Sequence, residues 1–254
     1  MASSDPFSLT DKTALITGGG TGIGLGIAQC MIQAGARVIL TGRREDVLRE
    51  AVAQLGEQAV YRVLDLDEQA ALPEAVQDME KHYGPLDILV NNAGIHLKKY
   101  AQETSDAEFL RVIQTNVLSA FSLTRECARG MIARQRGSII FISSMAALFG
   151  IDRVVAYSTA KTALTGMVHT LMTEYSPHHV RVNAIAPGWI ESAMFLNAVN
   201  ADPERKQRIV NRIAMPGFGR PEDIGHAAVF LSSEAGRYIT GVVLPVDGGG
   251  AMNF

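Results

Sequence analysis

The chain has 254 residues, which is enough for one large α/β domain or for two small ones. Hydrophobic residues make up 47% and charged residues 19%, a balance that is typical of globular proteins and excludes an intrinsically disordered chain. The formal net charge of -3 gives no electrostatic reason to expect nucleic acid or an anionic membrane as a partner.

The N-terminal stretch MASSDPFSLTDK has neither the basic region nor the apolar region of a secretory signal. No apolar run approaches the roughly 18 residues that a membrane-spanning helix needs. We therefore expect a protein that does not insert into membranes. Cys30 and Cys127 lie far apart in helix-like segments and are expected to be buried side chains rather than a disulfide or a metal pair, which favours a reduced, cytoplasmic setting.

Apolar runs rich in β-branched residues alternate with segments of helical period along the chain. The runs are nearly continuous in Val, Ile and Leu, which is typical of strands buried on both faces of a parallel sheet. The predicted strands are Thr13–Thr17, Arg37–Thr41, Ala59–Leu64, Leu86–Asn91, Ser138–Ser143, Val180–Ala186 and Val242–Val246. The predicted helices are approximately Gly22–Ala34, Asp46–Gly56, Glu68–Tyr83, Asp106–Gln135, Ala156–Ser176 and Glu222–Ser232. This alternation predicts an α/β fold of the Rossmann type, a doubly wound parallel sheet of about seven strands in a single domain over residues 1–254.

One stretch, about residues 187–221, shows no regular period. Pro187-Gly188, Pro203 and Pro216-Gly217 divide it into short pieces. A loop of this length inside a compact domain is usually functional, so we expect a substrate loop or lid here, with a surface insertion as the alternative.

The first predicted strand runs directly into a glycine-rich loop, Thr17-Gly18-Gly19-Gly20-Thr21-Gly22-Ile23-Gly24, and a helix follows. Glycines allow the tight turn and the close approach of backbone N–H groups to a pyrophosphate, which the helix N-terminus also attracts. No Gly-Lys-Ser/Thr follows, so the loop of a nucleotide hydrolase is disfavoured. The context favours a dinucleotide site over a purely structural turn.

The end of the second strand bears on which dinucleotide is bound. An NAD site places an acidic residue about 20 residues beyond the glycines, where it binds the ribose hydroxyls. Here the chain reads Gly42-Arg43-Arg44, and the first carboxylate is Glu45. Because a guanidinium binds a 2′-phosphate and a carboxylate repels it, we predict NADP(H) over NAD(H). The alternative is that both arginines are solvated charges at the start of a helix.

Tyr157 and Lys161 lie four residues apart in a predicted helix and therefore share one face. A phenol with a pKa near 10 is a poor acid–base group at neutral pH. An ammonium about 4 Å away, at an effective dielectric of about 20, contributes roughly 4 kcal/mol, which would bring that pKa to about 7. The pair thus forms a candidate catalytic unit for proton transfer.

Taken together, these features resemble the short-chain dehydrogenase/reductase family. The resemblance rests on the glycine loop, Asn91-Asn92-Ala93-Gly94, Asn116, Ser144, Tyr157-x-x-x-Lys161, Pro187-Gly188 and the closing Val246-Asp247-Gly248-Gly249. The motifs occur in the family's order and cover essentially the whole chain, which argues against a coincidental match. The resemblance implies an NAD(P)-dependent oxidoreductase that interconverts a secondary alcohol and a ketone.

The resemblance also assigns roles to individual residues. Tyr157 would transfer the proton to or from the substrate oxygen, and Lys161 would lower the pKa of Tyr157 and hold the nicotinamide ribose. Ser144, rather than its neighbour Ser143, would orient the substrate oxygen, and Asn116 would support a water chain to Lys161. The implied cofactor-binding set is Gly18, Gly20, Thr21, Gly22, Ile23, Gly24, Arg43, Asp65, Leu66, Asn91, Ala93, Gly94, Tyr157, Lys161, Pro187, Gly188, Ile190 and Ser192. In this set Asn91 and Ala93 line the adenine-ribose side, Asp65 accepts from the adenine amino group, and the Ile190 backbone binds the nicotinamide amide.

The sequence says less about the substrate. The stretches Ile95-His96-Leu97-Lys98-Lys99 and Gly150-Ile151-Asp152-Arg153 resemble family members that act on sugar acids, such as gluconate 5-dehydrogenase and 2-deoxygluconate 3-dehydrogenase. Lys98, Lys99 or Arg153 could bind a substrate carboxylate, with a solvated charge cluster as the alternative. The predicted substrate residues are His96, Lys98, Arg153 and Trp189.

Two other functions stay open. A 3-oxoacyl-(acyl carrier protein) reductase would need a basic patch for its acidic carrier, and no long basic run is evident. A non-catalytic regulator that senses NADP would typically lack the tyrosine or the lysine, and this chain has both. No metal site is expected, because His178-His179 has no carboxylate or cysteine at ligand spacing.

The predicted helices Asp106–Gln135 and Ala156–Ser176 carry apolar residues on more than one face. One face must cover the sheet, and the other needs a partner. Family members commonly assemble through these helices, so we expect a homotetramer of two-fold symmetry.

Overall fold

A computed structural model describes residues 5–253, apart from the side chains of 193, 194, 197 and 198. The first four residues of the N-terminal stretch considered above, and residue 254 of the predicted domain, lie outside the described residues.

Seven parallel strands form one sheet in the order β3-β2-β1-β4-β5-β6-β7. The strands are β1 (Thr13–Thr17), β2 (Arg37–Gly42), β3 (Ala59–Val63), β4 (Ile88–Asn91), β5 (Gly137–Ile142), β6 (Val180–Pro187) and β7 (Val243–Val246). The predicted fold class is confirmed, and each strand lies within two residues of its predicted bounds. The strand order reverses between β1 and β4, and ligands of such sheets bind in the crevice at that point, outside the carboxyl ends of the strands.

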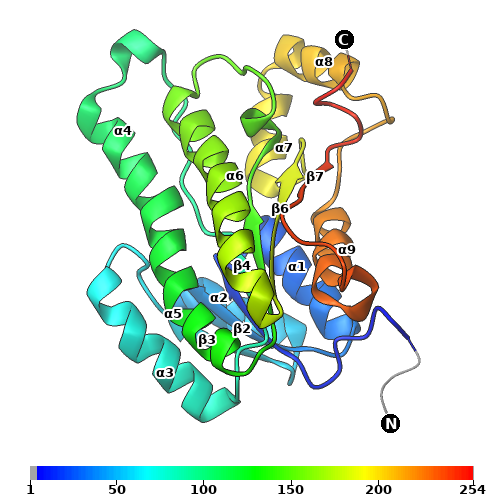
Figure 1. The fold of residues 1–254 in the computed structure, drawn as a ribbon. Coiled ribbons are helices and arrows are strands. Elements are labelled where there is room, and N and C mark those ends of the chain that lie inside the picture. Colours follow the sequence, from blue (N-terminus) through cyan, green and yellow to red (C-terminus); the bar gives the residue numbers. More distant parts are fainter. Residues whose placement is uncertain (1–4, 254) are drawn as a thin grey trace.

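Helices cover both faces of the sheet (Figure 1). One face is covered by α1 (Gly22–Gln33), α2 (Glu45–Leu55) and α9 (Pro221–Ser232). The other is covered by α3 (Leu72–Tyr83), α5 (Ser119–Ala133) and α6 (Val155–Tyr175). Across residues 5–253, no helix combines the length and the apolar character that crossing a bilayer requires.

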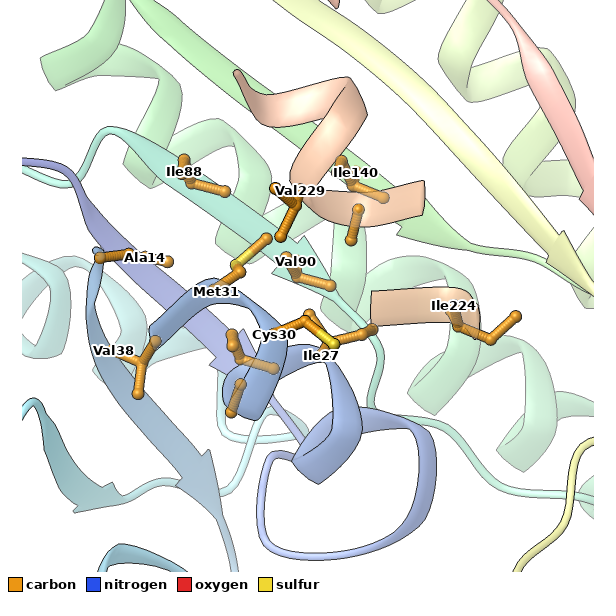
Figure 2. Packing of buried hydrophobic residues seen from close by; sticks show 14 of the residues in the cluster. Ala14, Ile27, Cys30, Met31, Val38, Ile88, Val90, Ile140, Ile224 and Val229 are labelled. Atoms are coloured by element: carbon orange, nitrogen blue, oxygen red, sulfur yellow. The ribbon is translucent and has the colours of Figure 1, made fainter. Parts of the chain in front are cut away.

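Close packing of α1 on α9 fixes the helix that follows the glycine loop (Figure 2). A Cβ on Gly26 would lie 2.4 Å from the Cβ of Pro221, and one on Gly225 would lie 2.5 Å from the Sγ of Cys30. Glycine at both positions therefore lets the two backbones approach. The apolar side chains between these helices and the sheet, Ile27 and Ile224 among them, are fully buried.

The predicted helix Asp106–Gln135 is interrupted. It consists of α4 (Asp106–Ile113), a π-helical turn η3 (Gln114–Leu118) and α5. A π turn inserts one extra residue into a helix and is frequent at functional sites. Asn116 lies in this turn, so the interruption coincides with a predicted site residue.

The segment 187–221 is not the loop that the sequence analysis expected. It contains two helices, α7 (Ala193–Asn200) and α8 (Pro203–Arg212). Asp202 caps α8 by accepting a hydrogen bond from the Arg205 amide at 2.9 Å. Pro203 then occupies the first turn, where its missing N–H costs nothing, so this proline begins a helix instead of breaking one.

Candidate active site

A cavity of about 250 Å³ lies at the carboxyl ends of β1, β2 and β3. Its walls come from the glycine loop, from the residues after β2 and β3, and from the segment after β4. Eight predicted cofactor residues line it: Gly18, Gly20, Thr21, Arg43, Asp65, Leu66, Ala93 and Gly94. Four segments distant in sequence thus converge where the strand order reverses.

The glycine loop has the conformation that anion binding requires. Gly18 has a φ of +62°, and a Cβ there would lie 3.1 Å from the Cα of Ala93. Gly22 has a φ of +54° with no atom within 4 Å of its Cβ position. Thr21 precedes α1 without a side-chain capping bond, so the first N–H groups of the helix are available to a ligand. A Cβ on Gly24 would lie 2.3 Å from the Gly18 oxygen, which makes this glycine a packing requirement of the loop.

Asn92, which the sequence analysis did not assign, holds the glycine loop in place. Its side-chain amide donates to the backbone oxygens of Thr17 at 2.9 Å and Gly18 at 3.2 Å. The Thr17 hydroxyl in turn accepts from the N–H groups of Asn92 and Ala93, both at 2.9 Å. The Asn91 side chain instead donates to Thr124 on α5 at 2.8 Å and borders neither of the two cavities of the site.

The charges at the end of β2 suit a phosphate. Arg43 and Arg44 are exposed and line the cavity. The nearest carboxylate in sequence, Glu45, is held by Arg49 and by the Tyr61 hydroxyl, both at 3.0 Å. These two bonds hold the pKa of Glu45 below its usual value, with the Arg49 bond the larger cause. The carboxylate therefore stays ionised and bound to groups outside the cavity.

A second cavity, of about 210 Å³, adjoins the first and shares Gly94 and Ile95 with it. Its lining includes the predicted residues Ile23, His96, Ser144, Tyr157, Lys161, Pro187 and Gly188. The catalytic candidates that follow β5 and lie on α6 therefore border a space adjacent to the one beside the glycine loop.

The two serines after β5 have separate environments. The Ser144 hydroxyl accepts from the Ala146 amide at 3.1 Å, a bond that does not use its own proton, so it can donate that proton to Tyr157 or to a substrate oxygen. The Ser143 hydroxyl donates to the backbone oxygen of Lys161 at 3.0 Å and thus braces α6. Both serines border the cavity, but only Ser144 also forms a side-chain hydrogen bond with Tyr157. This geometry agrees with the choice of Ser144 made from spacing.

The Tyr157–Lys161 pair shares one cavity, but the predicted lowering of the phenol pKa is absent in the free protein. Burial raises the pKa of Tyr157 above its ordinary value, and the bond with Ser144 opposes that rise. The Lys161 Nζ lies 5.6 Å from the centre of the Tyr157 ring and donates to the Ile142 oxygen at 2.7 Å. Burial also lowers the pKa of Lys161 to about 8. From the sequence, only the attraction between the two groups was considered. In the structure, burial has the largest effect on the pKa of each group.

Asn116 is buried, and both ends of its amide are engaged. Its Oδ1 accepts from the Ile95 N–H at 2.7 Å, and its Nδ2 donates to the Ile95 oxygen at 2.9 Å. Oδ1 and the Lys161 Nζ both lie on the side of Gly94 where a side chain would project, since a Cβ built there would lie 3.1 and 3.6 Å from them. The π turn thus brings Asn116 next to the wall of the catalytic cavity, where it fixes Ile95 and lies close to the Lys161 ammonium.

The segment after β6 closes the other side of the site. Gly188 packs closely on Asp247, since a Cβ at Gly188 would lie 2.6 Å from the Asp247 Cα. The Pro187-Gly188 motif and the closing Val246-Asp247-Gly248-Gly249 motif are therefore in contact in the fold. Trp189 and Glu191 supply the backbone bonds to Gly219, at 3.0 and 2.7 Å. The amide of Ile190, between them, therefore faces the opposite side. The Ser192 hydroxyl accepts from Phe195 at 3.1 Å and caps α7, a bond that the sequence analysis did not foresee.

The predicted substrate residues separate into two groups. The His96 ring lies 4.6 Å from the Tyr157 ring, centre to centre, and borders the catalytic cavity. Arg153 lies elsewhere: it stacks on Tyr100, with Cζ 4.3 Å from the ring centre, and lines a groove outside this cavity. Trp189 lines a neighbouring cavity formed with residues 213–219. The geometry thus does not place Arg153 or Trp189 in the catalytic cavity.

His96 is subject to the charge of a cation that the sequence analysis did not consider. Burial lowers the pKa of His96, and the positive charges of Arg205 and Lys98 lower it further. Arg205 belongs to α8, in the segment expected to be a loop. Among the described residues, neither Arg205 nor Lys98 forms an ion pair with a carboxylate. The signal that could have found Arg205 is the Asp202-Pro203 pair, which marks the start of its helix.

Curated relatives match over nearly the whole chain. The 2-dehydro-3-deoxy-D-gluconate 5-dehydrogenase of Bacillus subtilis is 37% identical, with 96% of each chain covered. The gluconate 5-dehydrogenase of Gluconobacter oxydans is 35% identical, with 98% of each covered. The 3-oxoacyl-[acyl-carrier-protein] reductase of Chlamydia muridarum is 34% identical over 95% of this chain and 98% of the relative.

Solved structures also match over nearly the whole chain. A proposed gluconate dehydrogenase from Agrobacterium tumefaciens superposes with a TM-score of 0.94 at 31% identity, covering 98% of this chain and 99% of the other. A proposed 2-deoxy-D-gluconate 3-dehydrogenase from the same species, solved with bound NADP, gives 0.89 at 37% identity, covering 97% and 99%. A family model described as enoyl-(acyl carrier protein) reductase matches residues 18–251. With the glycine loop and the Ser144, Tyr157 and Lys161 cavity in place, the chain belongs to the short-chain dehydrogenase/reductase family of NAD(P)-dependent oxidoreductases.

Proposed function

We propose that this enzyme interconverts a secondary alcohol and a ketone on a sugar acid, with NADP(H) as the hydride carrier. The observation that carries the proposal is that the two cavities adjoin. The glycine-loop cavity and the cavity of Ser144 and Tyr157 share a wall at Gly94 and Ile95. A dinucleotide that lies along the first can therefore present its nicotinamide to a substrate in the second.

The fit between these residues and a dinucleotide rests on the glycine loop. The free N–H groups at the start of α1 suit the pyrophosphate, and Asp65 borders the end of the cavity where adenine would lie. A bound nicotinamide supplies the hydride in ketone reduction and accepts it in alcohol oxidation.

Proton transfer in this scheme belongs to Tyr157. In the reducing direction the carbonyl carbon gains the hydride, and the carbonyl oxygen gains the phenolic proton of Tyr157. Because burial raises its pKa, the phenol stays protonated through neutral pH and is ready to donate. Ser144 donates a hydrogen bond to the same oxygen and holds it towards Tyr157. The Lys161 ammonium stabilises the phenolate that remains.

The substrate class follows from the charges around His96. Lys98 and Arg205 bring two positive charges to the side chain that borders the catalytic cavity. A substrate carboxylate would neutralise this cluster through charge-assisted hydrogen bonds. The relatives whose names refer to gluconate or its keto and deoxy derivatives support the same class. The segment 187–221, which carries Arg205, would then form part of the substrate site.

A substrate panel tests this proposal. Reduction by NADPH is measured with 5-keto-D-gluconate, with a neutral six-carbon ketose and with an acetoacetyl thioester. We expect the keto acid to be the best substrate and the neutral ketose to have a kcat/KM lower by about 10- to 100-fold, since it forfeits one charge-assisted contact. Equal rates with the acid and the neutral ketose would contradict the role of Lys98 and Arg205.

The second candidate is a 3-oxoacyl-(acyl carrier protein) reductase. Named reductases of that kind from Chlamydia muridarum and Rickettsia prowazekii are 34% and 36% identical to this chain. Turnover of the thioester alone in the same panel would establish this function in place of the first.

For the cofactor, we infer a preference for NADP(H) from the free arginines at the end of β2. Replacing both Arg43 and Arg44 by serine is expected to raise the KM for NADPH by about 10- to 100-fold, because the 2′-phosphate loses charge-assisted bonds. The KM for NADH should change little. Arg37→Ser, at the opposite end of the same strand, is the matched control. A wild-type enzyme that prefers NADH would overturn the inference.

We further propose a cytoplasmic homotetramer of two-fold symmetry. Exposed apolar side chains gather on the helices named in the sequence analysis: Leu110 on α4, Leu118 in η3 and Val155 on α6. Where such side chains form one apolar surface, a partner usually covers it. Sedimentation at several protein concentrations distinguishes a tetramer from the monomer that would contradict this assembly.

A further inference from the structure

Arg212, the last residue of α8, contacts two segments that are distant from it in sequence. Its guanidinium lies over the Phe149 ring, with Cζ 4.1 Å from the ring centre. Its Nε donates to the Gly250 oxygen at 2.9 Å, and its own backbone oxygen accepts from the Asn253 side chain at 3.1 Å. We call Phe149, Arg212, Gly250 and Asn253 the Arg212 cluster.

Each of the joined segments borders the catalytic cavity or leads into it. Phe149 follows Ser144 by five residues and precedes Tyr157 by eight, so it belongs to the connection between the two catalytic side chains. Gly250 belongs to the C-terminal turn, which begins at the Asp247 that packs against Gly188 of the cavity wall. Figure 1 shows α8 beside the C-terminal segment that follows β7, consistent with the bonds that join Arg212 to Gly250 and Asn253.

The helix α8 has little other means of attachment. Ile209 is its only buried residue. Just beyond it, the amides of Ala214 and Met215 both donate to the Gly248 oxygen at 3.0 Å. A helix with one buried side chain is placed by the contacts at its ends, and a segment with few buried contacts opens readily. The Arg212 cluster, together with Ile209 and the bonds to Gly248, therefore holds α8 and with it Arg205.

We propose that Arg212 is a positioning residue for substrate binding: by stacking on Phe149 and bonding to Gly250, it fixes α8 relative to the connection that carries Ser144 and Tyr157. This role rests on the proposed function, because it concerns how α8 presents Arg205 to a substrate carboxylate. Arg212 itself does not border the catalytic cavity.

The kinetic test compares Arg212→Met with Arg208→Met, an exposed arginine on the same helix. We expect Arg212→Met to raise the KM for 5-keto-D-gluconate by about 5- to 30-fold, the range that loss of a cation–π contact together with a hydrogen bond produces. The kcat and the dissociation constant of NADPH should stay near those of Arg208→Met. Arg212→Lys, which retains a cation over the ring, should restore part of the loss. Phe149→Leu should raise the same KM, and the double variant should cost less than the product of the two single effects.

A second measurement does not depend on turnover. Trp189 is the only tryptophan of the chain, and its indole lies against Gly250: a Cβ there would be 3.1 Å from its Cζ3. Release of the cluster should therefore make the fluorescence of cofactor-free Arg212→Met more quenchable by acrylamide than that of Arg208→Met.

The two readouts separate the possible failures. Equal quenching and equal KM in the two variants would overturn the positioning role. Increased quenching with an unchanged KM would also overturn it, since Arg212 would then be merely structural. If no sugar acid is reduced by the wild type, the proposed function fails, and the quenching comparison alone decides whether the Arg212 cluster holds α8.

Discussion

Replacing Tyr157 by phenylalanine is expected to lower kcat/KM for ketone reduction by about 10²- to 10⁴-fold, the range typical for loss of a general acid. Phenylalanine retains the ring that packs on His96, with centres 4.6 Å apart, and the ring face below the Lys161 Nζ at 5.6 Å. Only the proton donor and its hydrogen bond with Ser144 are removed. The measurement is steady-state kinetics with NADPH and the best ketone of the substrate panel.

Tyr175→Phe provides the matched control, because Tyr175 lies on the same helix, packs against the core and is distant from the cavity. Its kcat/KM should stay close to that of the wild type. NADPH binding, followed by nicotinamide fluorescence, should be nearly unchanged in both variants. A Tyr157→Phe enzyme that retains wild-type kcat/KM would remove Tyr157 from the mechanism.

The raised pKa of Tyr157 adds a pH dependence to this prediction. Because the phenol remains protonated up to and beyond its ordinary pKa, the rate of reduction should not decline through neutral pH on its account. A decline should begin only in the alkaline range, and the residual rate of Tyr157→Phe should lack that decline. A wild-type rate that falls already between pH 6 and 7, below the pKa of about 8 of Lys161, would instead indicate that the bound complex lowers the pKa of Tyr157, as the sequence argument first supposed.

The sheet was predictable because its strands are buried on both faces, so each one appears as an uninterrupted apolar run. Leu15 and Ile16 face opposite layers, and both are fully buried. A half-exposed strand would have given a weaker, alternating pattern. The glycine loop was predictable for a related reason: Gly18 adopts a positive φ, and Gly24 has no room for a side chain.

The helices of segment 187–221 were missed because their prolines were taken only as breaks. Pro203 follows the capping residue Asp202, and proline in that place starts a helix. The π turn at Asn116 carries no comparable local signal, since it depends on two hydrogen bonds to Ile95, 21 residues away. Contacts of this kind cannot be derived from spacing.

The positions of two charged or polar side chains could not be predicted for the same reason. Arg153 was expected at the substrate, and it stacks on Tyr100 instead, 53 residues earlier in the chain. The Asn91-Asn92 pair was found from its motif, but only the structure shows that Asn92 holds the glycine loop while Asn91 turns to α5. The sequence motifs and their order along the chain indicated which residues to expect at the site. The direction in which each side chain faces depends on tertiary packing, which the motifs do not show.

Lys161→Met is the second substitution with a large expected effect, and it acts on two measurable quantities. Methionine fills a similar volume but has no charge, so the phenolate left by Tyr157 would lose its ammonium. We expect kcat/KM to fall by about 100-fold or more, as for other groups that stabilise charge in a transition state. Lys81→Met, an exposed lysine on α3, is the control and should leave kcat/KM unchanged.

The same variant should change how stability depends on pH. Burial lowers the pKa of Lys161 to about 8 in the folded protein, against an ordinary value of 10.5. Below pH 8 both the folded and the unfolded chain carry this proton, so the folded state bears the full cost of the buried charge. Between pH 8 and 10.5 the unfolded chain binds more protons, and the free energy of unfolding of the wild type should therefore rise relative to Lys161→Met, by about 3 kcal/mol in total.

Urea unfolding of the cofactor-free proteins at pH 7 and at several values up to pH 10.5 measures this difference. Tyr157 is present in both proteins, so its own titration largely cancels from the comparison. A wild-type-minus-variant difference that stays constant over this range would mean that Lys161 does not hold a buried, destabilised charge. The ammonium would then be solvated in the folded protein, and since solvent weakens its attraction for the phenolate, Lys161 could not be the group that stabilises Tyr157 after proton transfer.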